Sequence, residues 1–194
     1  MGTQTSLTII SLSKLLKNPE IDKEQIQCSL SSFCPVYDHD DIRNFLEKSA
    51  IIQEEQKISR TYLWLDNESL YVKELKVLGL FAIALKVFTF APGTPENKRK
   101  RITKNPNSDT NNLCAAYLIG QIARSTDTPK GSGYALMQRA LMKIKEAQSI
   151  IGGSFVYLDC HNYEKIKSSY QKSGFKFLQE KQDGSGDIQM WLHL

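Results

Sequence analysis

Long apolar runs are scarce in this sequence. The longest, residues 77–90, is interrupted by Lys86, and a transmembrane helix needs about 20 consecutive apolar residues. The first residues also lack the basic segment and long apolar segment that together mark a signal peptide. We therefore expect a cytoplasmic protein with no membrane partner.

Cysteine is present, but not in a metal-binding or redox pattern. The four cysteines, Cys28, Cys34, Cys114 and Cys160, include no Cys-x-x-Cys pair and match no zinc spacing. This predicts idle or buried thiols in a reducing compartment, and no metal centre. The stretch Asp38-His39-Asp40-Asp41 leaves metal binding open, but a solvated turn followed by a helix cap is the preferred interpretation.

The overall charge gives little information about function. The sequence has 25 basic and 21 acidic residues, which gives a net charge of +4. This charge does not by itself identify a nucleic-acid binder. The length of 194 residues fits one ordinary domain. Hydrophobic residues make up 41%, which excludes a disordered chain.

Residues 91–112 differ in composition from the rest. They contain three prolines and five clustered cations: Lys98, Arg99, Lys100, Arg101 and Lys104. We expect a basic surface loop, longer than a compact domain normally keeps without a purpose. The sequence leaves three roles open for this loop: it could bind RNA phosphates, serve as a nuclear localisation signal, or only keep the protein soluble.

Hydrophobic patterning predicts an α/β fold with one central sheet. Residues 1–24 are expected to form an N-terminal helical extension, with an amphipathic patch at 9–16, and residues 25–194 to form the main domain. Strands are predicted at 27–33, 60–65, 75–90 (bulged at Gly79), 113–123 and 155–160, and in a hairpin of 175–178 with 187–192. Helices are predicted from Asp40 or Asp41 to about Lys57, after Gly133, and around 163–170 ending at Gly174.

A glycine loop at residues 128–133 connects the strand at 113–123 to the helix that follows. Backbone N–H groups at a helix N-terminus form a site for a phosphate or pyrophosphate. Gly131 and Gly133 have no Cβ, so a ligand can approach the main chain, and Lys130 adds a positive charge. The loop is neither a P-loop nor the dinucleotide-binding glycine pattern.

The order of these elements resembles the GCN5-related N-acetyltransferase (GNAT) family. Four blocks carry the resemblance: residues 119–124, 129–137, 156–160 and 170–175. The last is similar to the family's aromatic-Tyr-x-x-x-Gly-Phe element, with Ser169 at the first aromatic position. The resemblance extends over residues 27–194. It implies a mixed central sheet splayed between its fourth and fifth strands and flanked by helices, with acetyl-coenzyme A as cosubstrate.

The resemblance also implies roles for individual residues. The backbone of Ile122, Ala123 and Arg124 would bond the pantetheine arm of coenzyme A. The pyrophosphate would be held by Pro129, Lys130, Gly131, Ser132, Gly133 and Tyr134, and Asn162 would contact the coenzyme. Tyr170 would be the general acid that protonates the leaving thiolate. From the residues alone, a core tyrosine on an amphipathic helix stays an alternative for Tyr170.

The upstream half is similar to one branch of the family, the acetyltransferases that act as toxins in toxin–antitoxin pairs. Residues 44–46 with Ala50, 59–62 and 77–81 carry this similarity. Two positions depart from the pattern: Thr128 stands where the family usually has Gln or Arg, and Leu80-Phe81 replace an aromatic pair.

These observations favour an N-acetyltransferase that moves an acetyl group from acetyl-coenzyme A to a primary amine by direct attack. Residues 113–124 contain no carboxylate to act as a base. That absence favours an α-amino group, with a pKa near about 8, over a lysine near about 10.4. Two alternatives stay open: a toxin that acetylates aminoacyl-tRNA, and a non-catalytic module that binds coenzyme A or RNA. A homodimer is also open.

Overall fold

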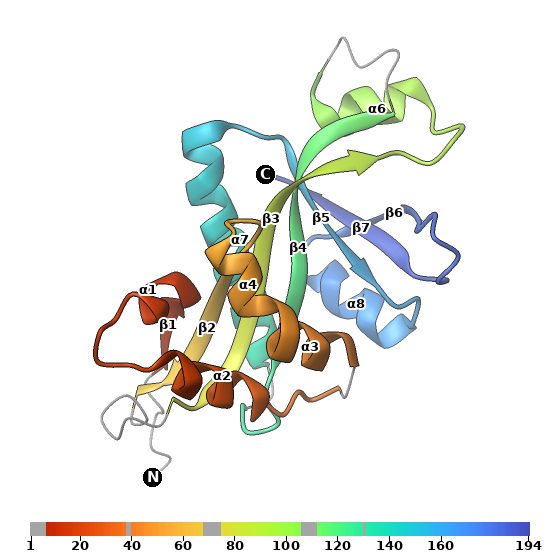
Figure 1. The fold of residues 1–194 in the computed structure, drawn as a ribbon. Helices are drawn as coiled ribbons and strands as arrows, with labels where there is room; N and C mark the ends of the chain where they lie inside the picture. Colours follow the sequence, from red (N-terminus) through yellow and green to blue (C-terminus); the bar gives the residue numbers. More distant parts are fainter. Residues whose placement is uncertain (1–6, 38–39, 68–74, 106–111, 130) are drawn as a thin grey trace. The chain divides into compact units, whose positions relative to one another are not determined.

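The computed structural model describes residues 7–37, 40–67, 75–105, 112–129 and 131–194 (Figure 1). In this part of the chain, seven strands form one sheet in the order β1-β2-β3-β4-β5-β7-β6. The strands are β1 (Leu7–Ser11), β2 (Arg60–Asp66), β3 (Val77–Thr89), β4 (Leu113–Arg124), β5 (Phe155–Cys160), β6 (Lys176–Glu180) and β7 (Ile188–His193). β4 and β5 pair in parallel, whereas β1–β2, β2–β3, β5–β7 and β6–β7 pair antiparallel. The predicted mixed central sheet is thus confirmed.

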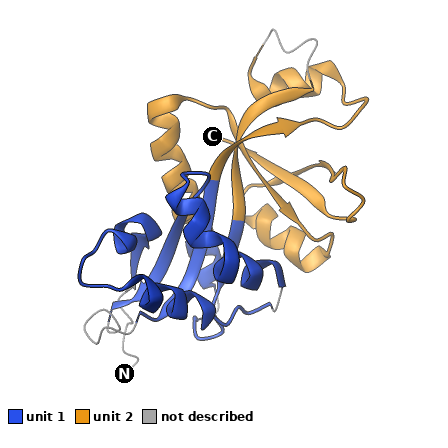
Figure 2. Cartoon of the chain, viewed as in Figure 1, with its two compact units in different colours: residues 1–83, 121–136 blue, residues 84–120, 137–194 orange. Residues whose placement is uncertain are grey.

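Two compact units divide the chain (Figure 2). The first contains residues 1–83 and 121–136, and the second contains residues 84–120 and 137–194. β3, β4 and the helix α7 (Ser132–Ile151) each contribute residues to both units.

In the first unit, short helices pack against the first strands. They are α1 (Leu12–Leu16), α2 (Lys23–Ser31), α3 (Asp40–Asn44), the π-helical turn η1 (Phe45–Ser49) and α4 (Ala50–Glu55). Their apolar residues join Leu63, Leu65 and Leu80 in one buried cluster. On β2, buried residues alternate with half-exposed ones, as expected of a strand with one covered face. The predicted helix from Asp40 is confirmed, with a π-turn in its middle.

Two predictions for the N-terminal region are wrong. Residues 9–11 belong to β1, in which Ile9 pairs with Trp64, so the helix of the expected extension covers only Leu12–Leu16. The β-branched residues Thr8, Ile9 and Ile10 favour this strand. Residues 27–31, expected in a strand, lie in α2. There Ile26 and Leu30 are four residues apart and both buried, which is helical spacing.

In the second unit, the core is aromatic. Phe88 makes edge-to-face ring contacts with Phe90, Phe155 and Tyr157, a favoured geometry for ring pairs. Ile102 is fully buried in the same cluster. It belongs to α6 (Glu96–Thr103), so the prediction of a loop over residues 91–112 is wrong for residues 96–103.

The remaining elements follow the predicted pattern. The register between β2 and β3 shifts beside Gly79, where Trp64 pairs with Gly79 and Leu65 with Val77, so the expected bulge is confirmed. β4, β5, α8 (Glu164–Lys172) and the β6–β7 hairpin also lie close to the predicted ranges. The helices in the described part of the chain include none of the length and apolarity required to span a membrane.

Candidate functional site

The turn after β4 is fixed by its own hydrogen bonds. The Thr128 hydroxyl donates to the Ser125 carbonyl oxygen at 2.6 Å, and the Thr128 N–H donates to the same atom at 3.2 Å. The Ser125 N–H in turn donates to the carbonyl oxygen of Leu78, at the bulge in β3, at 2.8 Å. Thr128 is buried. Its hydroxyl therefore serves the turn, at the position where the family usually has a longer polar side chain.

The glycine loop leads into the first turn of α7, as the sequence predicts. The Ser132 hydroxyl donates to the Pro129 carbonyl oxygen at 2.7 Å, and the Tyr134 N–H donates to the Gly131 carbonyl oxygen at 3.0 Å. Gly131 has a φ of +92°, in the left-handed region that favours glycine. A Cβ at Gly131 would meet no atom within 4 Å, so this backbone faces open space. The predicted site residue Lys130 lies outside the described residues.

The carboxyl end of β4 carries the three residues expected to bond pantetheine. Ile122, Ala123 and Arg124 are all half-buried. The Arg124 carbonyl oxygen accepts the Val36 N–H at 3.0 Å, so that oxygen is already used in the fold. Gly79 lets β3 approach Ala123 closely, because a Cβ there would lie 3.4 Å from the Ala123 oxygen.

Residues 34–36 form a strap beside the end of β4 that the sequence did not reveal. Pro35 makes an isolated antiparallel bridge with Ser125, and the Thr126 N–H donates to the Cys34 carbonyl oxygen at 3.1 Å. No local sequence pattern connects segments that are about 90 residues apart. The strap holds the last residues of β4 in place.

Tyr170 lies on α8 in the second unit, on the same helix as predicted. Its ring makes an edge contact with the buried Phe175, with ring centroids 6.2 Å apart. The Phe175 N–H donates to the Tyr170 carbonyl oxygen and the Gly174 N–H to that of Gln171, at 3.2 and 2.9 Å. These are the two bonds of a Schellman cap, and Gly174, with a φ of +92°, occupies its left-handed position.

The surroundings of Tyr170 keep its hydroxyl protonated. Burial, followed by the nearby Cys160 thiol, raises the pKa of Tyr170 to about 12. Burial also raises the pKa of Cys160 to about 11, with smaller contributions from Asp187 and Asp159. At neutral pH both groups are therefore uncharged, and the phenol holds a proton that it can donate.

Asn162 follows β5 as predicted and is exposed. Beside it, His161 Nδ1 lies 2.7 Å from Asp187 Oδ1. The sequence did not reveal this pair, because the two residues are 26 positions apart and meet only through the pairing of β5 with β7.

The basic segment is divided between bound and exposed cations. Lys98 Nζ donates to the Leu178 carbonyl oxygen at 2.9 Å, and Arg99 Nη1 donates to the Thr94 carbonyl oxygen at 2.7 Å. Lys100 forms an ion pair with Glu96. Arg101 and Lys104 are exposed. The five cations therefore do not form one uniform surface.

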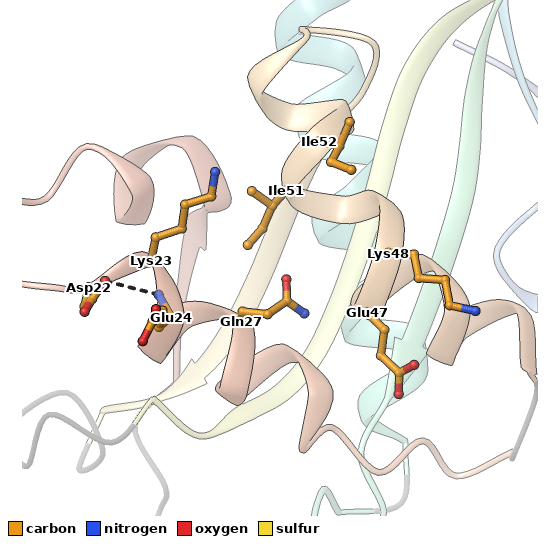
Figure 3. Close-up of a pocket in the computed structure, with 8 residues that line it drawn as sticks. All are labelled: Asp22, Lys23, Glu24, Gln27, Glu47, Lys48, Ile51 and Ile52. Carbon is orange, nitrogen blue, oxygen red and sulfur yellow. Dashed lines mark hydrogen bonds between the residues drawn. The ribbon is translucent and has the colours of Figure 1, made fainter.

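A pocket of about 480 Å³ lies in the first unit between α2 and the η1–α4 segment (Figure 3). Gln27 donates from its side-chain nitrogen to the Leu46 carbonyl oxygen in the π-turn, at 3.2 Å. The lining mixes acidic, basic and apolar side chains: Asp22, Lys23, Glu24, Gln27, Glu47, Lys48, Ile51 and Ile52. None of these is a predicted site residue.

The described residues include no group of three or more histidine, cysteine, aspartate or glutamate side chains placed to hold a metal ion. Asp40 and Asp41 begin α3, whereas Asp38 and His39 lie outside the described residues.

Comparison with known proteins gives matches among solved structures. No family model and no curated protein matches the chain. A structure of AtaT complexed with acetyl-methionyl-tRNAfMet is 20% identical, covers 97% of this chain and 95% of that one, and has a TM-score of 0.68. A mutant of the AtaT toxin, bound to the C-terminus of the antitoxin AtaR and to acetyl-CoA, is 18% identical over 96% and 92%, with a TM-score of 0.63. A mutant of KacT is 16% identical over 96% and 94%, with a TM-score of 0.67.

The chain has the GNAT fold. The expected splay agrees with the short pairing of its fourth and fifth strands. β4 has 12 residues, but it pairs with β5 at two positions, Tyr117 with Val156 and Leu118 with Tyr157. In this GNAT fold, the glycine loop and the end of β4 lie in the first unit, whereas Asn162 and Tyr170 lie in the second.

Proposed function

We propose that the chain is an acetyltransferase toxin that moves the acetyl group of acetyl-coenzyme A to the α-amino group of an aminoacyl-tRNA. The similarity to AtaT carries this proposal: it covers 97% of this chain, and AtaT was solved with acetyl-methionyl-tRNAfMet. A coarser conclusion, transfer to some primary amine, would stand even with a different acceptor.

Acetyl-coenzyme A is assigned to the glycine loop and β4. Gly131 faces open space at the start of α7, where backbone N–H groups and the helix dipole favour a pyrophosphate. The backbone of Ile122 and Ala123 is assigned to the pantetheine arm, with Arg124 contributing its N–H. Lys130, Tyr134 and Asn162 complete the proposed coenzyme contacts.

Tyr170 supplies the proton in the proposed reaction. The neutral amine attacks the thioester carbonyl, a C–N bond forms, and the C–S bond breaks. The amine loses its extra proton to water, and the leaving sulfur takes the phenol proton, which water later restores to Tyr170. With a pKa of about 12, the phenol is a weaker acid than a thiol, whose reference pKa is about 8.5. Transfer must therefore accompany the cleavage of the C–S bond.

The acceptor follows from the absence of a carboxylate in β4. Without a carboxylate on β4 to act as the general base, the proposed reaction depends on the fraction of amine that is already neutral. At pH 7 that fraction is about 10% for an α-amino group of pKa about 8, but well below about 0.1% for a lysine of pKa about 10.4. An aminoacyl ester presents an α-amino group of the favourable kind.

We assign the RNA contact to the exposed cations of the basic segment, with Arg101 and Lys104 in the leading role. The proposed partners are charged tRNA and a neutralising antitoxin, and the proposed location is the cytoplasm, where charged tRNA is found. A homodimer stays part of the proposal, with no surface assigned to it.

The deciding experiment supplies labelled acetyl-coenzyme A to the purified chain with charged tRNA, uncharged tRNA or free lysine. We expect label on charged tRNA, in a form released with the amino acid when the ester is hydrolysed. Label on lysine or a small amine alone would remove the tRNA acceptor but keep the transferase. Binding of acetyl-coenzyme A with no thioester consumed by any amine would favour the non-catalytic module.

A further inference from the structure

We propose that the Arg124 side chain is the cation that binds the coenzyme A pyrophosphate, in the place of the side chain that Thr128 no longer provides. This inference rests on the proposed function. It gives the Arg124 side chain a role separate from the pantetheine contact that is assigned to the Arg124 backbone. Arg124, Thr128 and the start of α7 all belong to the first unit.

The Arg124 side chain extends from the end of β4 toward the first turn of α7. A Cβ at Gly133 would lie 3.8 Å from Arg124 Cδ and 3.9 Å from its Nε. The stem therefore passes over Gly133, and the guanidinium lies beside the N-terminal turn to which the pyrophosphate is assigned. A valine or leucine at position 124 would not reach this far.

The guanidinium is held loosely and can turn toward an anion. Its Nη1 lies 3.3 Å from the Thr128 hydroxyl oxygen and 3.5 Å from the Thr128 carbonyl oxygen. Both distances exceed the usual N–H···O distance of about 2.9 Å. Asp127, the nearest acidic residue in sequence, already pairs with Lys76 Nζ at 2.8 Å. A guanidinium has five N–H donors, and its planar fork matches the oxygens of a phosphate.

The turn does not depend on this arginine. Thr128 donates to Ser125 at 2.6 Å, and Ser125 donates to Leu78 at 2.8 Å, without any part of the guanidinium. The backbone of Arg124 is fixed separately, through its carbonyl oxygen and Val36. A purely structural role for the guanidinium would therefore be small.

Two acetyl donors test the inference: acetyl-coenzyme A and acetyl-pantetheine, which lacks the pyrophosphate. Arg124→Met keeps the stem and removes the charge. We expect it to weaken acetyl-coenzyme A binding about 10–100-fold, the range for a lost hydrogen bond to a charged group, and to reduce the salt dependence of binding. The kcat/KM for acetyl-pantetheine should fall by a clearly smaller factor than that for acetyl-coenzyme A, because the substitution leaves the backbone of residue 124 in place. Arg124→Lys should lie between, because it keeps a charge without the fork.

The control is Arg139→Met, which removes the same charge from an exposed position on α7. It should leave acetyl-coenzyme A affinity within about twofold of wild type. Equal losses with both donors in Arg124→Met would make Arg124 a structural residue and overturn the proposal, as would unchanged affinity for acetyl-coenzyme A. If Arg124→Met fails to fold, the comparison of donors in Arg124→Lys decides in the same way. Failure of the wild type to bind acetyl-coenzyme A would contradict the proposed function itself.

Discussion

Tyr170 is the residue on which the chemistry can be tested most directly. We expect Tyr170→Phe to lower kcat by about 10²–10⁴-fold, the usual effect of losing a general acid. Affinity for acetyl-coenzyme A should barely change, because the ring and its contact with Phe175 remain. Single-turnover kinetics and calorimetry measure the two quantities separately. Tyr163→Phe is the matched control, because Tyr163 is an exposed tyrosine directly before α8.

The pH profile gives a second readout of Tyr170. The phenol works in its protonated form, and its pKa is raised to about 12, so its ionisation cannot reduce the rate below about pH 11. The rate should rise near about pH 8, as the α-amino group becomes neutral, and then level off. Wild-type turnover in Tyr170→Phe would make Tyr170 a core residue and not the acid. A fall in kcat centred between pH 9 and 10 that is lost in Tyr170→Phe would keep the acid role and contradict the raised pKa.

The helix α6 combines a structural lysine with exposed cations. Replacing Arg101 and Lys104 with serine should weaken tRNA binding across sequences. It should also reduce the salt slope by about 1.4–1.8, since each phosphate contact contributes about 0.7–0.9. The melting temperature should not change, because both side chains are exposed. Lys98→Ser should instead lower the melting temperature, because its bond to the Leu178 oxygen is lost. Filter binding at two salt concentrations makes the comparison.

Acetylation of a small free amine should survive in the Arg101 and Lys104 double variant. An unchanged salt slope in that variant would remove α6 from the RNA contact. If wild-type protein retains neither charged nor uncharged tRNA at about 150 mM salt, the nucleic-acid hypothesis is lost altogether.

Elements with a clear apolar pattern were predictable from the sequence, and helices with only one or two buried residues were not. β4 and α7 have 12 and 20 residues and carry clear apolar patterns. α6 has one buried residue, Ile102, among mostly charged neighbours, so no helical period is visible. α2 was mistaken for a strand because its two buried residues, Ile26 and Leu30, leave a weak pattern.

The candidate site was predictable where it follows chain order and not where it depends on long-range pairing. The glycine loop and Tyr170 lie in contiguous motifs. The strap at residues 34–36, the pair of His161 with Asp187, and the approach of Arg124 to Gly133 arise only when distant or folded-back segments meet. Local periodicity contains no information on such contacts.

For the whole molecule, binding of acetyl-coenzyme A should appear as added stability. A ligand at 100 times its Kd stabilises the folded state by about 2.7 kcal/mol, which raises the melting temperature of a chain of this size by about 5–11 °C. Gly133→Asp should abolish this increase, because a carboxylate enters the pyrophosphate site. Gly133→Ala should keep most of it, since its Cβ would make ordinary contacts at 3.8 Å.

Gly131 should behave differently from Gly133 in the same experiment. Its φ of +92° strains any other residue, so Gly131→Ala should melt at a lower temperature than wild type even without ligand, whereas Gly133→Ala should not. Gly131→Asp combines this strain with the charge and should lose the ligand-induced increase as well. Scanning calorimetry with and without acetyl-coenzyme A separates the two effects. If acetyl-coenzyme A still raised the melting temperature of Gly131→Asp and Gly133→Asp as much as that of the wild type, the coenzyme would bind elsewhere on the protein. That result would contradict the assignment of the glycine loop as the coenzyme site.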